Sequence, residues 1–108
     1  MLAILPEDHP LAQQDAVPLE AFRILGLTPN IRYTIHDDYA IMTMVEAGLG
    51  VSILAELVLY RTHYRLALRP TVPPVNRTLA IGYRDKNSLP IASKYFIDFI
   101  MKNIGRLP

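Results

Sequence analysis

Three histidines and one aspartate pair are the side chains that could support metal or acid–base chemistry. His9, His36 and His63 stand far apart, and no two have the i, i+4 spacing of a helical metal site. Asp37 and Asp38 could act as a carboxylate pair, because neighbouring carboxylates push their pKa values apart. The pair also directly precedes a helical pattern, where aspartate is a common N-cap. We therefore expect capping and no metal site.

Other chemical motifs are weaker still. Ser52 lacks the G-x-S-x-G context of a nucleophile elbow. Gly48 and Gly50 follow a helical pattern, whereas a phosphate-binding loop places its glycines before a helix. The chain has no cysteine, so disulfides, thiolate zinc sites and cysteine nucleophiles are excluded. We expect no cofactor and no enzymatic activity, and keep a small α/β enzyme using the aspartate pair as an alternative.

Composition points to an ordinary globular domain. The 108 residues are 51% hydrophobic and 19% charged, with a net charge of +1. That balance lacks the basic face expected of a nucleic-acid-binding domain. No apolar stretch reaches the roughly 20 residues of a membrane-spanning helix. We expect a cytoplasmic protein without membrane contact.

Short apolar or alternating runs and longer helical patterns follow one another along the chain. This alternation favours an α/β fold with a mainly parallel sheet flanked by helices. The glycine pair predicts a tight turn: Gly48 closes a helix with positive φ, and Gly50 lets the backbone pass close to the helix end. Ser88 is a plausible N-cap of the last helix, and Pro70 is expected outside any central strand. The expected strands are 2–5, 31–35, 51–54, 66–68 and 77–84; the expected helices are 19–22, 39–47, 55–59 and 90–104.

The loop before residue 39 is the best candidate for a binding surface. In open α/β sheets, ligands bind beyond the carboxyl ends of strands, at loops that begin helices. The N–H groups of the helix after Asp38 could hold a carboxylate or similar anion. The end of the strand at 51–54 would lie beside them. We predict that ligand contacts come from His36, Asp38, Tyr39, Leu54 and Ala55.

Three segments, in the right order, resemble the effector-binding domain of LysR-type transcriptional regulators. The first is LAILPEDHPLA, residues 2–12, which is similar to the family's strand and histidine-proline-leucine-alanine turn. The second is DDYAIMTMVEAGLGVSILAELVL, residues 37–59, with the family's helix, glycine turn and apolar strand. The third is RTLAIGYRDKNSLPIASKYFIDFI, residues 77–100, which resembles its last strand and closing helix.

The resemblance implies a periplasmic-binding-protein-like type II fold, in which two α/β subdomains hold a small-molecule effector between them. Residues 1–108 would be a partial domain: 11–76 the second subdomain, 1–10 and 77–84 the crossover strands, and 85–108 the closing helix of the first subdomain. The family binds DNA through an N-terminal helix-turn-helix, which is not among these residues, and acts as homo-oligomers. An anionic effector is one possibility.

Two departures from the family pattern affect the expected pocket. After residues 17–20 the family usually has another strand and a longer helix, whereas here Phe22 is followed at once by Arg23. This apparent gap is either a deletion in the protein or a stretch of the protein that this sequence omits. Ala55 stands where the family often has proline. Without a first subdomain the closing helix would expose apolar surface, so we expect the chain not to fold independently.

Two functions therefore stand beside the enzyme alternative. The first is effector sensing in a LysR-type regulator, in which effector binding changes the angle between subdomains and hence the geometry of the oligomer. The second is a solute-binding or transport protein with the same fold, which would need a secretory signal that the sequence does not show.

Overall fold

The computed structural model describes residues 1–22 and 30–107. They form two compact units, Met1–Arg77 and Thr78–Pro108. The first unit holds β1 (Leu2–Pro6), η1 (Pro10–Gln13), β2 (Val17–Pro18), η2 (Leu19–Phe22), α1 (Asp38–Glu46), β3 (Ser52–Leu54), α2 (Glu56–Leu59) and β4 (Leu66–Val72), and the second holds α3 (Ile91–Asn103) and η3 (Ile104–Arg106).

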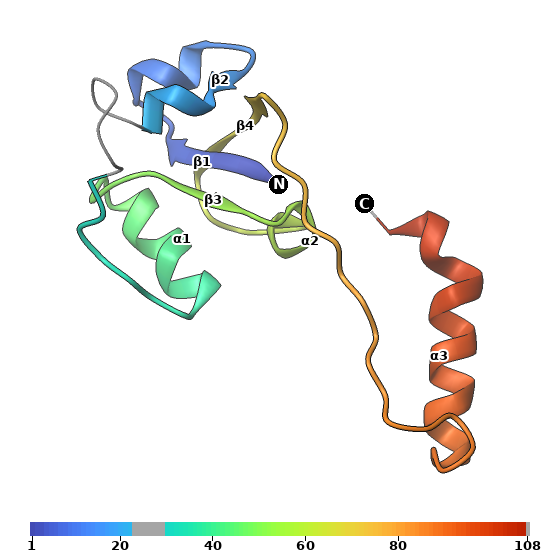
Figure 1. The fold of residues 1–108 in the computed structure, drawn as a ribbon. Coiled ribbons are helices and arrows are strands. Elements are labelled where there is room, and N and C mark those ends of the chain that lie inside the picture. The colour runs from blue at the N-terminus through green and yellow to red at the C-terminus, as the bar shows by residue number, and fades with distance from the viewer. Residues whose placement is uncertain (23–29, 108) are drawn as a thin grey trace. The chain divides into compact units, whose positions relative to one another are not determined.

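The sheet of the first unit has the order β2-β4-β1-β3 (Figure 1). β1 pairs antiparallel with both β3 and β4, and β2 pairs parallel with β4. Three of the four strands thus share one direction and β1 runs against them. Two of the three strand pairings are antiparallel, so the sheet is mixed and not mainly parallel as expected.

Apolar side chains are buried on both faces of β1. Its alternate residues point to opposite faces, which explains why the strand reads as a continuous apolar run rather than an alternating one. On one face Ala3 and Leu5 pack with η1, β2 and β4, and on the other Ile4 packs with α1, β3 and α2. The remaining members of the two buried clusters are Ala12, Val17 and Ala67 on the first face, and Met42, Val45, Leu54 and Leu59 on the second.

Helix α1 begins and ends as its sequence predicts. Asp37 is the N-cap, with its side chain accepting hydrogen bonds from two backbone N–H groups. Gly48 has φ +78° and donates to the carbonyl of Val45, while the N–H of Leu49 donates to that of Met44, which together form a Schellman motif. The i, i+3, i+4 spacing of Ile41, Met44 and Val45 predicts that they form the buried face, but Met42 rather than Met44 is fully buried.

Gly50 does not have the role expected of it. A Cβ built on Gly50 meets no atom within 4 Å among the residues that the structure describes, so no close backbone approach requires glycine there. The turn between α1 and β3 therefore depends on Gly48, whose positive φ is costly for any residue with a Cβ.

Two segments with strand-like sequences are not strands in the structure. Among residues 1–22 and 30–107, neither 31–35 nor 77–84 has a ladder partner, although both alternate apolar and polar residues. Alternation reports a preference for extended backbone, whereas a strand also needs a neighbour with free N–H and C=O groups. Residues 23–29, which border the expected gap after Phe22 and include the predicted helix end at Gly26, lie outside the described residues.

β4 runs beyond the expected 66–68 and includes Pro70, which is paired on one side only and so occupies no central sheet position. β4 pairs with β1 as far as Pro70 and with β2 only from Thr71, so no residue of β4 is paired on both sides. A proline in such a singly paired position need not remove a ladder hydrogen bond, because its missing N–H can fall on the unpaired side.

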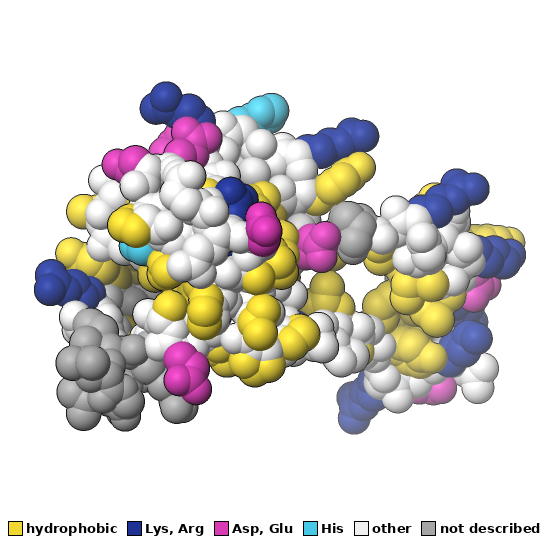
Figure 2. All heavy atoms as spheres, turned by 90° about the horizontal axis from the view of Figure 1, so that it is seen from above, with side chains coloured by type: hydrophobic (Ala, Val, Ile, Leu, Met, Phe, Trp, Pro, Cys, Tyr) yellow, Lys and Arg dark blue, Asp and Glu magenta, His cyan; other side chains and the backbone are white. Residues whose placement is uncertain are grey.

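The second unit consists mainly of α3. Its N-cap is Pro90 without a side-chain hydrogen bond, so the prediction of Ser88 as the cap is wrong; the Ser88 hydroxyl donates to the carbonyl of Asp85 instead. No residue of α3 is buried, and Tyr95 is 71% exposed. Figure 2 shows the apolar side chains of this unit as a yellow surface with lysine and arginine at its margins.

Candidate functional site

A hollow of about 540 Å³ lies at the N-terminal end of α1. It brings together three of the five residues expected to contact a ligand, namely His36, Asp38 and Tyr39. All three come from the loop and first helical turn that follow residue 35. The other residues that line it are Asp37, Leu57, Val58 and Tyr60.

The two remaining expected residues do not line the hollow. Leu54 is 7% exposed and packs in the core beneath α1. Ala55 is the N-cap residue of α2. The prediction ended with the residues at the end of β3 and did not include α2. In the structure α2 turns back, so that Leu57 and Val58 line the hollow beside the loop. The apolar pattern of residues 56–59 predicts a short helix but does not specify that this helix turns back toward the loop.

The first turn of α1 already holds a negative charge. Asp37 Oδ1 accepts hydrogen bonds from the N–H of Tyr39 at 2.9 Å and of Ala40 at 3.3 Å. These are two of the donors that a helix N-terminus could otherwise offer to an anionic ligand. The capping interpretation of the aspartate pair is therefore confirmed for Asp37. Asp38 adds a second carboxylate in the same turn, where the helix dipole favours it.

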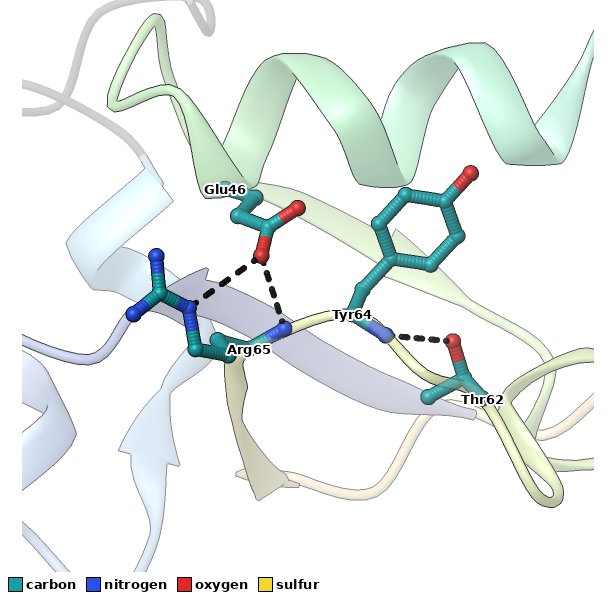
Figure 3. A network of polar contacts seen from close by, with 4 residues as sticks. All are labelled: Glu46, Thr62, Tyr64 and Arg65. Carbon is teal, nitrogen blue, oxygen red and sulfur yellow. Dashed lines mark hydrogen bonds and ion pairs between the residues drawn. The ribbon is translucent and has the colours of Figure 1, made fainter.

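The connection between α2 and β4 secures the other end of α1. Glu46 Oε1 accepts a hydrogen bond from the backbone N–H of Arg65 at 3.1 Å and lies 3.6 Å from its Nε (Figure 3). The N–H of Tyr64 donates to Thr62 Oγ1 in the same network. The Thr62 hydroxyl lies 3.6 Å from the sulfur of Met42, a residue on the buried face of α1. These contacts fix the helix whose first turn forms the hollow.

Tyr60 presents an aromatic ring to the hollow, with a cation beside it. The guanidinium of Arg61 lies 5.2 Å from the centre of that ring, within the range of a cation–π contact. Arg61 has φ 57°, an uncommon value for a residue with a side chain. The hollow thus combines two tyrosines, two carboxylates and one imidazole.

Two of the described arginines make contacts within the fold. Arg69 donates to the carbonyls of Ala12, Gln14 and Leu68 at 2.6, 2.8 and 2.8 Å, and so joins η1 to β4. Arg65 pairs with Glu46. Among the described residues, no group of three histidine, aspartate or glutamate side chains is placed to hold a metal ion.

A second and larger groove, of about 600 Å³, lies between β3, α1 and residues 30–35. None of the residues predicted to bind a ligand lines it. Its lining is mainly apolar and includes Phe22, Ile31, Tyr33, Ile35, Ile41, Met44, Val45, Leu49 and Val51.

Comparison with known proteins identifies the domain. The family model described as the LysR substrate binding domain matches residues 19–104. This chain belongs to the LysR substrate-binding domain family. Among curated proteins, a Bacillus subtilis (strain 168) protein described as the uncharacterized HTH-type transcriptional regulator YvbU is 24% identical over 127 residues. That alignment covers 97% of this chain and 44% of the relative, so the chain spans less than half of the relative's length.

Solved structures of LysR proteins share the fold. The chain superposes on HinK, a LysR family transcriptional regulator from Pseudomonas aeruginosa, with a TM-score of 0.73 and 24% identity, covering 98% of this chain and 46% of that one. The reduced form of OxyR gives a TM-score of 0.66 at 23% identity, with 89% and 55% covered. The periplasmic-binding-protein-like type II class expected from sequence is confirmed for this LysR domain. None of its described helices is long and apolar enough to cross a bilayer.

Proposed function

We propose that this LysR domain senses a small molecule for a DNA-binding transcription regulator in the cytoplasm, and that it acts by binding rather than catalysis. The family match over residues 19–104 supports this assignment. DNA contact would come from a helix-turn-helix outside these residues, and the regulator would act as a homo-oligomer. Residues 11–76 would form the second subdomain, and 85–108 would complete the first.

The observation that carries the proposal is the hollow at the start of α1. It joins a loop–helix junction to α2, and its side chains combine hydrogen-bonding groups with aromatic rings. Small-molecule sites usually have this mixture, in which apolar surface gives affinity and a few polar groups give orientation. Ligand contact there would bias the position of α1, and this bias would change the angle between this subdomain and the first one.

The charges favour a particular ligand class. Two carboxylates face the hollow, and Asp37 already uses the N–H groups of Tyr39 and Ala40. We therefore propose a neutral or cationic ligand that carries hydrogen-bond donors. An anionic effector would bind only if it displaced Asp37 from the helix start.

Ligand-induced thermal shifts test the site. A panel of amines, sugars, amino acids and carboxylates is screened against the natural full-length protein and a variant of it carrying Asp38→Asn and Tyr39→Ala. Tyr33→Ala serves as the matched control, because Tyr33 is also an exposed tyrosine but lies in the other groove. Loss of the shift in the double variant alone supports the site; a shift that survives it removes these residues from the proposal.

The solute-binding alternative is distinguished by whether the ligand changes DNA binding. A regulator should change DNA binding of the natural full-length protein when its ligand is added, measured by electrophoretic mobility. A transport component would bind the same ligand without any change on DNA.

A further inference from the structure

The turn that follows α2 has an arginine at a position that usually holds glycine. Tyr60 has φ −65° and ψ 123°, and Arg61 has φ 57°. The N–H of Thr62 donates to the carbonyl of Leu59 at 3.3 Å. These features are those of a type II turn, whose third residue has a positive φ and is usually glycine or asparagine. The left-handed backbone is costly for a residue with a Cβ, and residues strained in this way cluster at functional sites.

The residues on either side of this turn are anchored, but the ring of Tyr60 is not. Leu59 is buried in the core. The Thr62 hydroxyl lies 3.6 Å from the sulfur of Met42 and accepts a hydrogen bond from the N–H of Tyr64. Tyr60 itself is 55% exposed. Its backbone is therefore held in place, while its ring needs a further contact to keep one orientation at the hollow.

The guanidinium of Arg61 supplies that contact. Its central carbon lies 5.2 Å from the centre of the Tyr60 ring, which is within cation–π range. Within residues 1–22 and 30–107, Arg61 forms no ion pair, so no described carboxylate accounts for the position of its side chain. Tyr60 lines the hollow, whereas Arg61 does not. The cation therefore holds the ring without taking up the space of a ligand.

We propose that Arg61 is a positioning residue of the effector site: its guanidinium fixes the Tyr60 ring at the hollow and strengthens ligand binding without touching the ligand. A ring that is already ordered loses less side-chain entropy when a ligand packs against it. Because the contact is exposed, its loss should weaken binding by about two- to fivefold. The inference rests on the proposed function, because it concerns the affinity of the same site.

Two measurements on the natural full-length protein separate this role from a structural one. Asparagine suits the third position of a type II turn, so Arg61→Asn should leave the melting temperature within about 2 °C of wild type. Fluorine NMR of the fluorotyrosine-labelled protein reports the mobility of the ring, with its resonance assigned through Tyr60→Phe. Arg61→Asn should narrow that resonance because the ring moves more freely, and Arg61→Lys, which keeps a cation, should narrow it less.

Either measurement can refute the positioning role. An unchanged line width of the Tyr60 resonance in Arg61→Asn would overturn the proposal. A fall of several degrees in the melting temperature of Arg61→Asn would also overturn it, because the arginine would then serve the stability of the turn rather than the site.

Binding of benzyl alcohol connects the ring with the site. This probe carries a hydroxyl donor for the carboxylates of the hollow and an aromatic ring to pack on Tyr60, and it is uncharged, so removing a cation does not by itself change its attraction. Its affinity is measured by chemical-shift titration of the backbone amides. Arg61→Asn should bind it about two- to fivefold more weakly than wild type, and Arg61→Lys should recover part of the loss.

Arg106→Asn is the matched control. It removes the same charge at an exposed position outside the lining of the hollow, and it should bind benzyl alcohol as wild type does. Equal affinities of wild type and Arg61→Asn would overturn the proposal. Failure of wild type to bind benzyl alcohol would count against the proposed ligand class, while the line width of the Tyr60 resonance would still decide the role of Arg61.

Discussion

Asp37 connects the stability of the domain with the chemistry of its candidate site, so replacing it by alanine has two opposite effects. The carboxylate caps α1 through hydrogen bonds of 2.9 and 3.3 Å to the N–H groups of Tyr39 and Ala40. Removing such a cap costs about 1 kcal/mol, within a range of roughly 0.5–2 kcal/mol. Because Asp37 is exposed, we expect no additional cost from lost packing.

Urea denaturation followed by circular dichroism measures this loss. For a domain of this size, with a slope of about 1–2 kcal/mol per molar urea, the midpoint should fall by roughly 0.5–1 M. Asp37→Ser keeps an oxygen that can cap the helix and should stay within a few tenths of a kcal/mol of wild type. Asp38→Asn removes a neighbouring charge without removing the cap, and serves as the charge control.

The same substitution should make the site receptive to anions. With the N–H groups of Tyr39 and Ala40 free, sulfate should restore part of the lost stability in Asp37→Ala, by about 0.3–1 kcal/mol beyond its effect on wild type at equal ionic strength. The reasoning is refuted if Asp37→Ala has the wild-type midpoint, or if Asp37→Ser is destabilised as much as Asp37→Ala.

Two further predictions follow from the same helix. Gly48→Ala should cost about 1–2 kcal/mol and lower the melting temperature by several degrees, because Gly48 has φ +78°. Gly50→Ala should have little effect, because no atom of the described residues contacts the added methyl group. Equal melting temperatures for the two variants would contradict this account of the turn. Met42→Ala should lower the free energy of unfolding by about 2–5 kcal/mol because Met42 is fully buried, and Met44→Ala should lower it clearly less because Met44 is only half-buried. Chemical denaturation of both variants compares them. A larger loss of stability for Met44→Ala would disprove the assignment of the buried face.

Features determined by neighbouring residues could be predicted from the sequence. The start of α1 at the aspartate pair and its end at Gly48 depend on hydrogen bonds within a few residues. β1 was recognisable because a strand buried on both faces must be apolar at every position. The predicted positions of His36, Asp38 and Tyr39 at one hollow follow from the same local logic, since all three lie within one loop and helix turn.

Features that require a partner could not be predicted in this way. Residues 31–35 have a strand-like pattern but pair with no strand in the part of the chain that the structure describes, and the pattern carries no information about a partner. Pro70 lies within β4 because β4 changes partner at that point, which depends on the register of two distant strands. Leu57 and Tyr60 reach the hollow because α2 folds back after β3, a turn that local periodicity does not specify.

Chemical-shift mapping of a bound ligand on the isotopically labelled natural full-length protein tests the central claim most directly. The small molecule that gives the largest thermal shift is titrated, and backbone amide resonances are followed. The account predicts that the perturbed amides cluster at residues 36–39 and 56–60, with those of 51–54 much less affected. Perturbations confined to the groove between β3 and residues 31–35, or spread without a centre, would contradict the assignment of the recognition surface to the start of α1.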